Sequence, residues 1–140
     1  TEIKRVLKPD GRLYVTVWSS VSPFFKALAD ALGEHINNKI AEQSLAPFAF
    51  RDEEVIKDLI TKAGFTRITS KVITINRQIA AANISIPKEI AGNPVGVKVV
   101  ENEQDVVDRI VKQVEIAIQG YKNNSGFAIP QETYLFEAQV

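Results

Sequence analysis

Aromatic and polar side chains gather at two places in the sequence where they could line a pocket for a small molecule. Trp18 and Ser19 stand at the end of an apolar run, and Phe48, Phe50 and Arg51 stand in a short segment between two helical patterns. Aromatic walls could hold two reactants in line in a dry pocket, which accelerates a reaction by proximity and orientation. The guanidinium of Arg51 could bind an acidic group. We therefore single out these five residues as candidate substrate-binding residues.

Each of these residues also has a purely structural interpretation. Trp18 could pack into a core beneath a neighbouring helix, because large aromatic side chains dominate core energetics. Phe48 and Phe50 could form a lid over a substrate, or they could anchor their loop to the core. Arg51 could be a solvated charge beside the start of a helix. The sequence alone leaves these alternatives open.

Other kinds of reactive site find little support. The chain has no cysteine, which excludes disulfides, thiolate nucleophiles and zinc–thiolate sites. His35 is the single histidine, so an imidazole metal site has no second ligand of its kind. Asp105 and Asp108 are interpreted as charges at a helix start rather than as paired catalytic carboxylates. The sequence contains neither a Gly-x-Ser-x-Gly nucleophile turn nor a phosphate-binding glycine loop.

Composition and charge indicate an ordinary globular domain. The 140 residues are 45% hydrophobic and 24% charged, with 17 basic and 17 acidic side chains. A chain of this length can bury a core, and we expect one domain over residues 1–140. The balanced charge gives no basic surface for nucleic acid, and no apolar run is long enough to span a membrane. Cytoplasm is the expected location, since no targeting signal is visible.

Hydrophobic periodicity predicts the elements that carry the candidate residues. Residues 2–8 have helical spacing and end at a Pro-Asp-Gly turn. Residues 12–18 are largely apolar on both faces, which predicts a strand covered on both sides, as in a parallel sheet. An amphipathic helix is expected over residues 24–40, after a Ser-Pro start. An aromatic loop over residues 44–51 follows it.

The second half of the chain alternates in the same way. Residues 52–64 predict a helix that begins at an aspartate cap and ends at a glycine. Residues 66–78 predict a strand, and residues 80–100 are undecided apart from a short helix opened by Ser-Ile-Pro over residues 85–90. Residues 103–119 predict a helix capped by Asn102, and residues 133–140 predict the last strand. Strands separated by helices indicate an α/β fold.

Three segments carry a family resemblance. Residues 5–13, Arg-Val-Leu-Lys-Pro-Asp-Gly-Arg-Leu, resemble the "R-x-L-K-P-G-G-R-L" approach to the fifth strand of type 11, class I S-adenosylmethionine-dependent methyltransferases. Asp10 stands where glycine is usual, and Pro-Asp-Gly still makes a good turn. Residues 59–65 are similar to the "L-L-x-x-A-G-F" that precedes the sixth strand. Residues 125–132 are similar to a "G-x-A-F-P-x-E" lead into the final strand.

The resemblance implies a partial Rossmann-like fold and a function. Residues 12–18, 66–78 and 133–140 would be strands five, six and seven, in the order 5-7-6 with the last strand antiparallel. The parent protein would transfer a methyl group from S-adenosylmethionine to a small-molecule acceptor. This chain would supply the acceptor side, with Trp18 and Ser19 at the carboxyl end of the first strand, where ligands of open α/β sheets lie.

The same resemblance implies that the cofactor-binding half lies outside this sequence. The glycine-rich loop and the acidic residue that hold the cofactor follow the first two strands of the family fold, and no Gly-x-Gly occurs here. We therefore assign no cofactor residue and expect none bound to this segment alone. The chain contains no methionine, so we interpret its first residue as a boundary within a longer protein.

A rival hypothesis is a non-enzymatic α/β interaction domain that forms a homo-oligomer. It rests on the missing glycine-rich loop. The strand over residues 12–18 would also expose the edge at which the family's fourth strand pairs, and bare edges invite pairing with another chain. We therefore expect either a homodimer through this edge or a cover over it.

Overall fold

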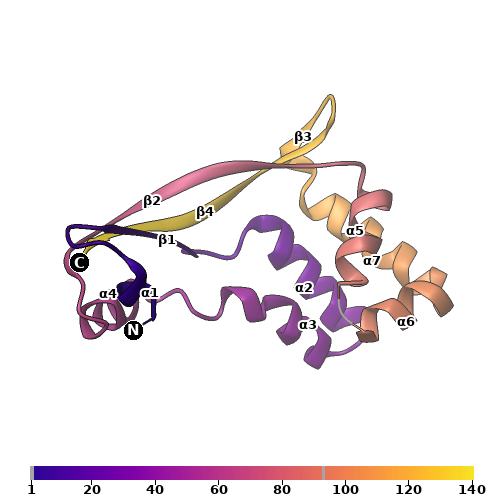
Figure 1. Ribbon diagram of the computed structural model, residues 1–140. Coiled ribbons are helices and arrows are strands. Elements are labelled where there is room, and N and C mark those ends of the chain that lie inside the picture. The colour runs from indigo at the N-terminus through magenta and orange to yellow at the C-terminus, as the bar shows by residue number, and fades with distance from the viewer. Residues whose placement is uncertain (1, 93) are drawn as a thin grey trace. The chain divides into compact units, whose positions relative to one another are not determined.

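The computed structural model describes residues 2–92 and 94–140, which form helices and a four-stranded sheet (Figure 1). The chain divides into two compact units. Unit 1 comprises Thr1–Ser20, Phe48–Thr74 and Glu132–Val140. Unit 2 comprises Val21–Pro47 and Ile75–Gln131. The expectation of a single domain stays a prediction.

Unit 1 contains the edge of the sheet and two helices. Helix α1 (Glu2–Val6) leads into strand β1 (Arg12–Trp18), and helix α4 (Glu53–Lys62) leads into strand β2 (Thr66–Ile79). Strand β4 (Gly126–Gln139) lies between β1 and β2 and pairs with β1 in antiparallel register. The boundary between the units falls within β2 and β4.

The core of unit 1 lies between one face of the sheet and α4. Val15 pairs with Phe136 and Leu13 pairs with Ala138, so these side chains share a face. Leu13, Phe136 and Ala138 pack with Ile56 and Ile60 of α4 in one hydrophobic cluster. The cap of α4 is Asp52, whose Oδ1 accepts hydrogen bonds from the backbone of residues 54 and 55 at 3.0 and 3.1 Å. The predicted aspartate cap is thus confirmed.

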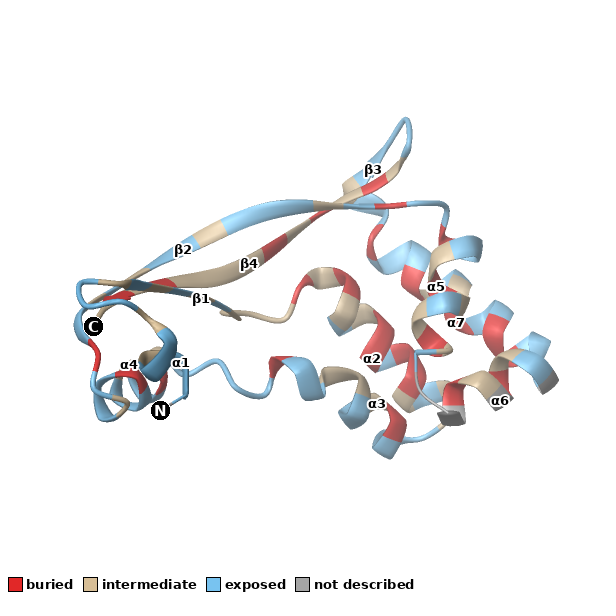
Figure 2. Ribbon diagram, in the orientation of Figure 1, coloured by how far each residue is buried: buried red, intermediate tan, exposed pale blue. Residues whose placement is uncertain are grey.

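Unit 2 is built mainly from helices whose buried faces meet (Figure 2). They are α2 (Pro23–His35), α3 (Asn38–Leu45), α5 (Ala82–Ile90), α6 (Pro94–Asn102) and α7 (Gln104–Ala117). A short 3-10 turn, η1 (Ala46–Phe48), follows α3, and another, η2 (Gln119–Tyr121), follows α7. Strand β3 (Lys122–Asn123) then pairs with the start of β4 as a hairpin. One large hydrophobic cluster joins these helices.

The helix expected over residues 24–40 is wrong in extent. Helix α2 ends at His35, and Ile36 has a non-helical backbone with φ −122° and ψ −77°. Asn37 is extended, and its Oδ1 accepts a hydrogen bond from the Ile40 N–H at 3.0 Å, which caps α3. Asparagine competes with the helical backbone for hydrogen bonds and favours caps, so it divides a continuous apolar stripe into two helices.

The expectation that β1 is covered on both faces is also wrong. Leu13, Val15 and Val17 are only partly buried, and Tyr14 on the other face is 55% exposed. Strand β1 lies at the edge of an antiparallel region, and an antiparallel sheet can leave one face in water. The β-branched residues of β1 therefore reflect a preference for strand structure and do not indicate that both faces of the strand are buried.

Two further boundaries differ from the sequence expectation. Strand β4 begins at Gly126 rather than at residue 133, because the polar link before it closes a hairpin with β3. Pro130 is tolerated within this strand at a position beyond the residues that β1 pairs. Helix α5 begins at Ala82, so Pro87 lies inside it rather than at its start. The predicted cap Asn102 belongs to α6, and its side chain lies outside the described part.

Candidate functional site

The carboxyl end of β1 brings together several of the predicted residues within unit 1. The rings of Trp18 and Phe48 lie 5.9 Å apart between centroids at an angle of 38°. Phe48 is 2% exposed, so this side chain anchors the segment before α4. Arg51 Nη1 donates a hydrogen bond to the Phe48 carbonyl at 3.1 Å. Arg51 therefore holds the backbone that positions the aromatic pair.

Ser19 and its neighbours add polar groups beside this aromatic pair. The Ser19 N–H donates to the Glu132 carbonyl at 3.2 Å, which continues the pairing of β1 with β4. The Ser20 hydroxyl donates to Glu132 Oε2 at 3.2 Å. The hydroxyl oxygen of Ser19 is buried and has no hydrogen-bond partner among the residues that the structure describes. A buried hydroxyl without a partner is unfavourable, so it is a candidate contact for a bound polar group.

Glu132 was not selected as a site residue from the sequence. It appeared only as the last position of the segment similar to the lead into the final strand. Its contribution depends on strand pairing across more than a hundred residues, which places it opposite the end of β1. Thr133 beside it donates from its hydroxyl to the Val17 carbonyl at 2.9 Å.

Phe50 lies in the wall of an apolar groove of about 260 Å³ in unit 1. The groove is lined by residues of α1, β1 and α4 and of the adjoining loops. The two helices lie on the same side of the sheet (Figure 1). Its lining residues are Ile3, Leu13, Val15, Val17, Phe50, Ile56, Leu59, Ile60, Ala63 and Phe65. Phe50 is 50% exposed, so it does not anchor the loop in the way that Phe48 does.

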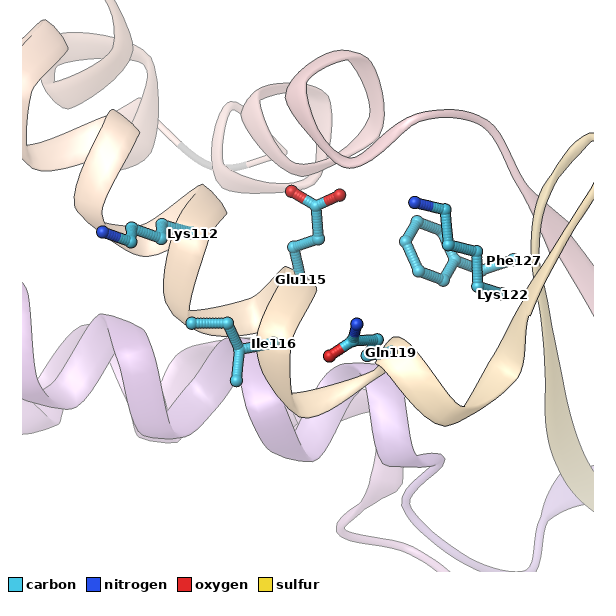
Figure 3. A pocket seen from close by; sticks show the side chains of 6 residues that line it. All are labelled: Lys112, Glu115, Ile116, Gln119, Lys122 and Phe127. Carbon is cyan, nitrogen blue, oxygen red and sulfur yellow. The ribbon is translucent and has the colours of Figure 1, made fainter.

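A second hollow, of about 200 Å³, lies on α7 and the hairpin of unit 2. Figure 3 shows the side chains of Glu115 and Lys122 facing it from opposite sides, with the ring of Phe127 behind Lys122. No predicted site residue lines this hollow. Its charged side chains are all exposed, and we assign it no ligand.

His35 has a structural role in unit 2. Its Nε2 lies 2.7 Å from Gln113 Oε1, and Gln113 Nε2 donates to Glu34 Oε2 at 2.9 Å. These contacts tie α2 to α7. No group of three side chains suited to a metal ion occurs in residues 2–92 and 94–140. No helix in the same ranges is both long and apolar enough to cross a membrane.

Comparison of the chain with models of known protein families gave no match, and comparison with curated proteins gave none either. An aromatic pair, a buried hydroxyl and a carboxylate at one strand end can hold and orient a small molecule that carries a hydroxyl or an amine. Among the described residues, the Ser19 hydroxyl has no base within hydrogen-bonding distance.

Proposed function

We propose that this chain is the acceptor-side portion of a class I S-adenosylmethionine-dependent methyltransferase that acts on a small molecule. The observation that carries the proposal is the strand order β1-β4-β2, in which β4 is antiparallel to β1. This is the order that the sequence resemblance implies for strands five, seven and six. A last strand that returns to the middle of its sheet is a demanding arrangement, because it needs pairing between distant segments.

The acceptor would lie at the carboxyl end of β1. Ligands of open α/β sheets lie beyond the carboxyl ends of the parallel strands. Trp18 and Phe48 offer an aromatic wall there, and Glu132 lies at the same end because β4 runs the other way. Ser19 and Glu132 would bind the hydroxyl or amine of the acceptor and aim it at the donor. Such a site accelerates transfer by orientation.

The cofactor would supply the methyl group, and we assign none of the residues of this chain to holding it. Among the described residues, the hydroxyl of Ser19 is the one buried side-chain polar group without a hydrogen-bond partner. A single hydroxyl cannot make the several polar contacts that hold a nucleoside. What the chain contributes is the placement of the acceptor and the exclusion of water around it. By itself it should bind S-adenosylmethionine weakly or not at all.

Calorimetric titration of S-adenosylmethionine into two proteins tests the proposal. One is the 140-residue chain, and the other is the chain extended upstream to its natural start. We expect binding by the extended protein alone. Binding by neither would overturn the proposal and favour the non-enzymatic interaction domain. Binding by the 140-residue chain would contradict the assignment of the cofactor residues to another segment.

A further inference from the structure

The hairpin of β3 and β4 in unit 2 closes through a short exposed turn. Asn123, the last residue of β3, pairs with Gly126, the first residue of β4, so Asn124 and Ser125 form the turn. Both turn residues are exposed, and the turn projects away from the helices of unit 2 (Figure 1). Asparagine and serine are typical turn residues, because their short polar side chains bond the local backbone. Water has open access to the side chain of Asn124.

The two neighbouring asparagines of this hairpin differ in how their side chains are held. Asn123 Oδ1 accepts a hydrogen bond from the Ser125 N–H at 2.8 Å, and Asn123 Nδ2 donates to Gln78 Oε1 at 3.2 Å. The side chain of Asn124 makes no hydrogen bond with any residue in the ranges 2–92 and 94–140. The amide of Asn123 is therefore fixed at both ends, whereas the amide of Asn124 can rotate toward the backbone.

The residue after Asn124 is small, and its backbone nitrogen is not committed to strand pairing. Asn124 is the only asparagine in the sequence that is followed by glycine, alanine or serine. A small side chain leaves the backbone nitrogen of Ser125 accessible, whereas a β-branched side chain would crowd it. Among the described residues, the Ser125 N–H bonds to the side chain of Asn123 and to no strand carbonyl. This nitrogen can therefore leave its hydrogen bond without breaking the ladder of the hairpin.

We propose that Asn124 is a site of spontaneous deamidation. The backbone nitrogen of Ser125 gives its proton to a base in the solvent and forms a bond with Cγ of Asn124. The bond between Cγ and the side-chain nitrogen breaks, and that nitrogen takes up a proton and leaves as ammonia. The product is a cyclic imide, which a water molecule then opens. Cleavage of the new Cγ–N bond gives an aspartate at position 124, and cleavage of the original peptide bond gives an isoaspartate.

The modification changes both the charge and the backbone of the hairpin. Either product adds one negative charge to a chain that has 17 basic and 17 acidic side chains. Isoaspartate also adds a carbon atom to the backbone of the turn between Asn123 and Gly126, because the chain then runs through the former side chain. The pairing of these two residues therefore weakens in the isoaspartate form. The inference concerns unit 2 alone and is independent of the methyl-transfer proposal.

Incubation of the folded 140-residue chain in mildly alkaline buffer, followed by tryptic digestion and mass spectrometry, tests the proposal. Trypsin cuts after Lys122, so Asn124 lies in a different peptide from Asn76 and Asn83. These two asparagines are internal controls, because both are exposed but lie within β2 and α5. We expect the mass change of an amide converted to an acid to appear several-fold faster at Asn124, as both aspartate and isoaspartate. A sample digested without incubation corrects for conversion during digestion.

Two substitutions of Ser125 test whether its nitrogen is the attacking group. Ser125→Val places a β-branched side chain beside that nitrogen and should slow the conversion of Asn124 several-fold. Ser125→Gly removes the side chain and should accelerate the conversion. Circular dichroism checks that each variant is folded, and the comparison with Asn76 and Asn83 in the parent chain needs neither variant. Conversion of Asn124 no faster than that of these two asparagines, or a rate that neither substitution changes in folded protein, would overturn the proposal.

Discussion

Gly126 adopts a backbone conformation that other residues tolerate poorly. Its φ is +127°, and a Cβ atom built on it would lie 2.1 Å from the carbonyl oxygen of Ile79. Both features belong to unit 2, where β4 begins. Gly126→Ala should therefore lower the free energy of unfolding by more than ~2 kcal/mol, since the strain and the steric overlap add. Urea denaturation followed by circular dichroism measures this change.

Gly120 offers the matched control. A Cβ atom at this position meets nothing within 4 Å, and its φ lies outside the left-handed region. Gly120→Ala should change the free energy of unfolding by no more than ~1 kcal/mol, and it should be stabilising if it changes anything, because alanine reduces the entropy of the unfolded chain. If both variants lose the same free energy of unfolding, the backbone conformation of Gly126 and its close approach to Ile79 are not the cause of the loss.

Residue types at the candidate site were only partly readable from the sequence. Trp18 and Phe48 were selected for their aromatic character, and the structure places their rings in contact. The role of Arg51 in holding the Phe48 carbonyl could not be read from the sequence, because it depends on the path of the loop. Glu132 was not selected, because only strand pairing brings it opposite Ser19.

At the scale of elements, Glu53 ties the start of α4 to β2. Its carboxylate accepts a hydrogen bond from Ser70 and lies 2.7 Å from Lys57 Nζ. The Lys57 ammonium first, and the Ser70 hydroxyl second, lower the pKa of Glu53 below its ordinary value of 4.5. A carboxyl group whose pKa is lower in the folded state stabilises the fold above its unfolded pKa. That stabilisation is lost as the pH falls through 4.5 and then through the lower folded value.

Glu53→Gln should therefore flatten the loss of stability on acidification below about pH 5, because the variant has no carboxyl group to protonate there. Thermal unfolding from pH 7 to pH 3 measures the effect. Glu42→Gln is a control for the change in net charge, because Glu42 forms no ion pair among the described residues. If Glu53→Gln and the parent lose stability in parallel across this range, the link between α4 and β2 does not contribute in the way described.

The helices matched the expectation from the sequence where spacing and capping residues indicated the same boundary. They differed from it where a polar side chain competed with the helical backbone for hydrogen bonds. Helix α4 has its aspartate cap and its glycine stop, and Gly64 has a φ of +87° as a left-handed stop requires. The stripe over residues 24–40 was continuous, yet Asn37 ends it by capping the next helix. Hydrophobic periodicity shows which side chains could share a face of a helix. It does not show where a polar side chain accepts a backbone hydrogen bond and so ends the helix.

At the scale of the molecule, two hydrophobic clusters organise the described residues. Ile110 is fully buried in the cluster of unit 2, and Phe136 is 1% exposed in the cluster of unit 1. The two clusters share no residue among those described. Ile110→Ala and Phe136→Ala should each lower stability by about 2–5 kcal/mol, because each leaves a cavity. Each should also speed amide exchange mainly within its own unit, since local opening follows cooperative units.

Amide hydrogen exchange followed by nuclear magnetic resonance distinguishes these patterns. The amides of Leu28 and Val107 report on unit 2, and those of Ile60 and Phe65 report on unit 1. Equal acceleration at all four amides in either variant would mean that the chain opens as one cooperative body. That outcome would instead support the single domain expected from the sequence.

The sequence by itself determined much of the local structure: which runs form strands, where the helix capped by Asp52 begins, and that the fold mixes α and β structure. These features depend on neighbours along the chain, through side-chain spacing and capping hydrogen bonds. Only the tertiary structure decided that one face of β1 stays open and that Ser19 is buried beside Glu132. Those features depend on pairing between segments far apart in the chain. The free energy of that pairing depends on both segments together, so neither segment alone predicts it.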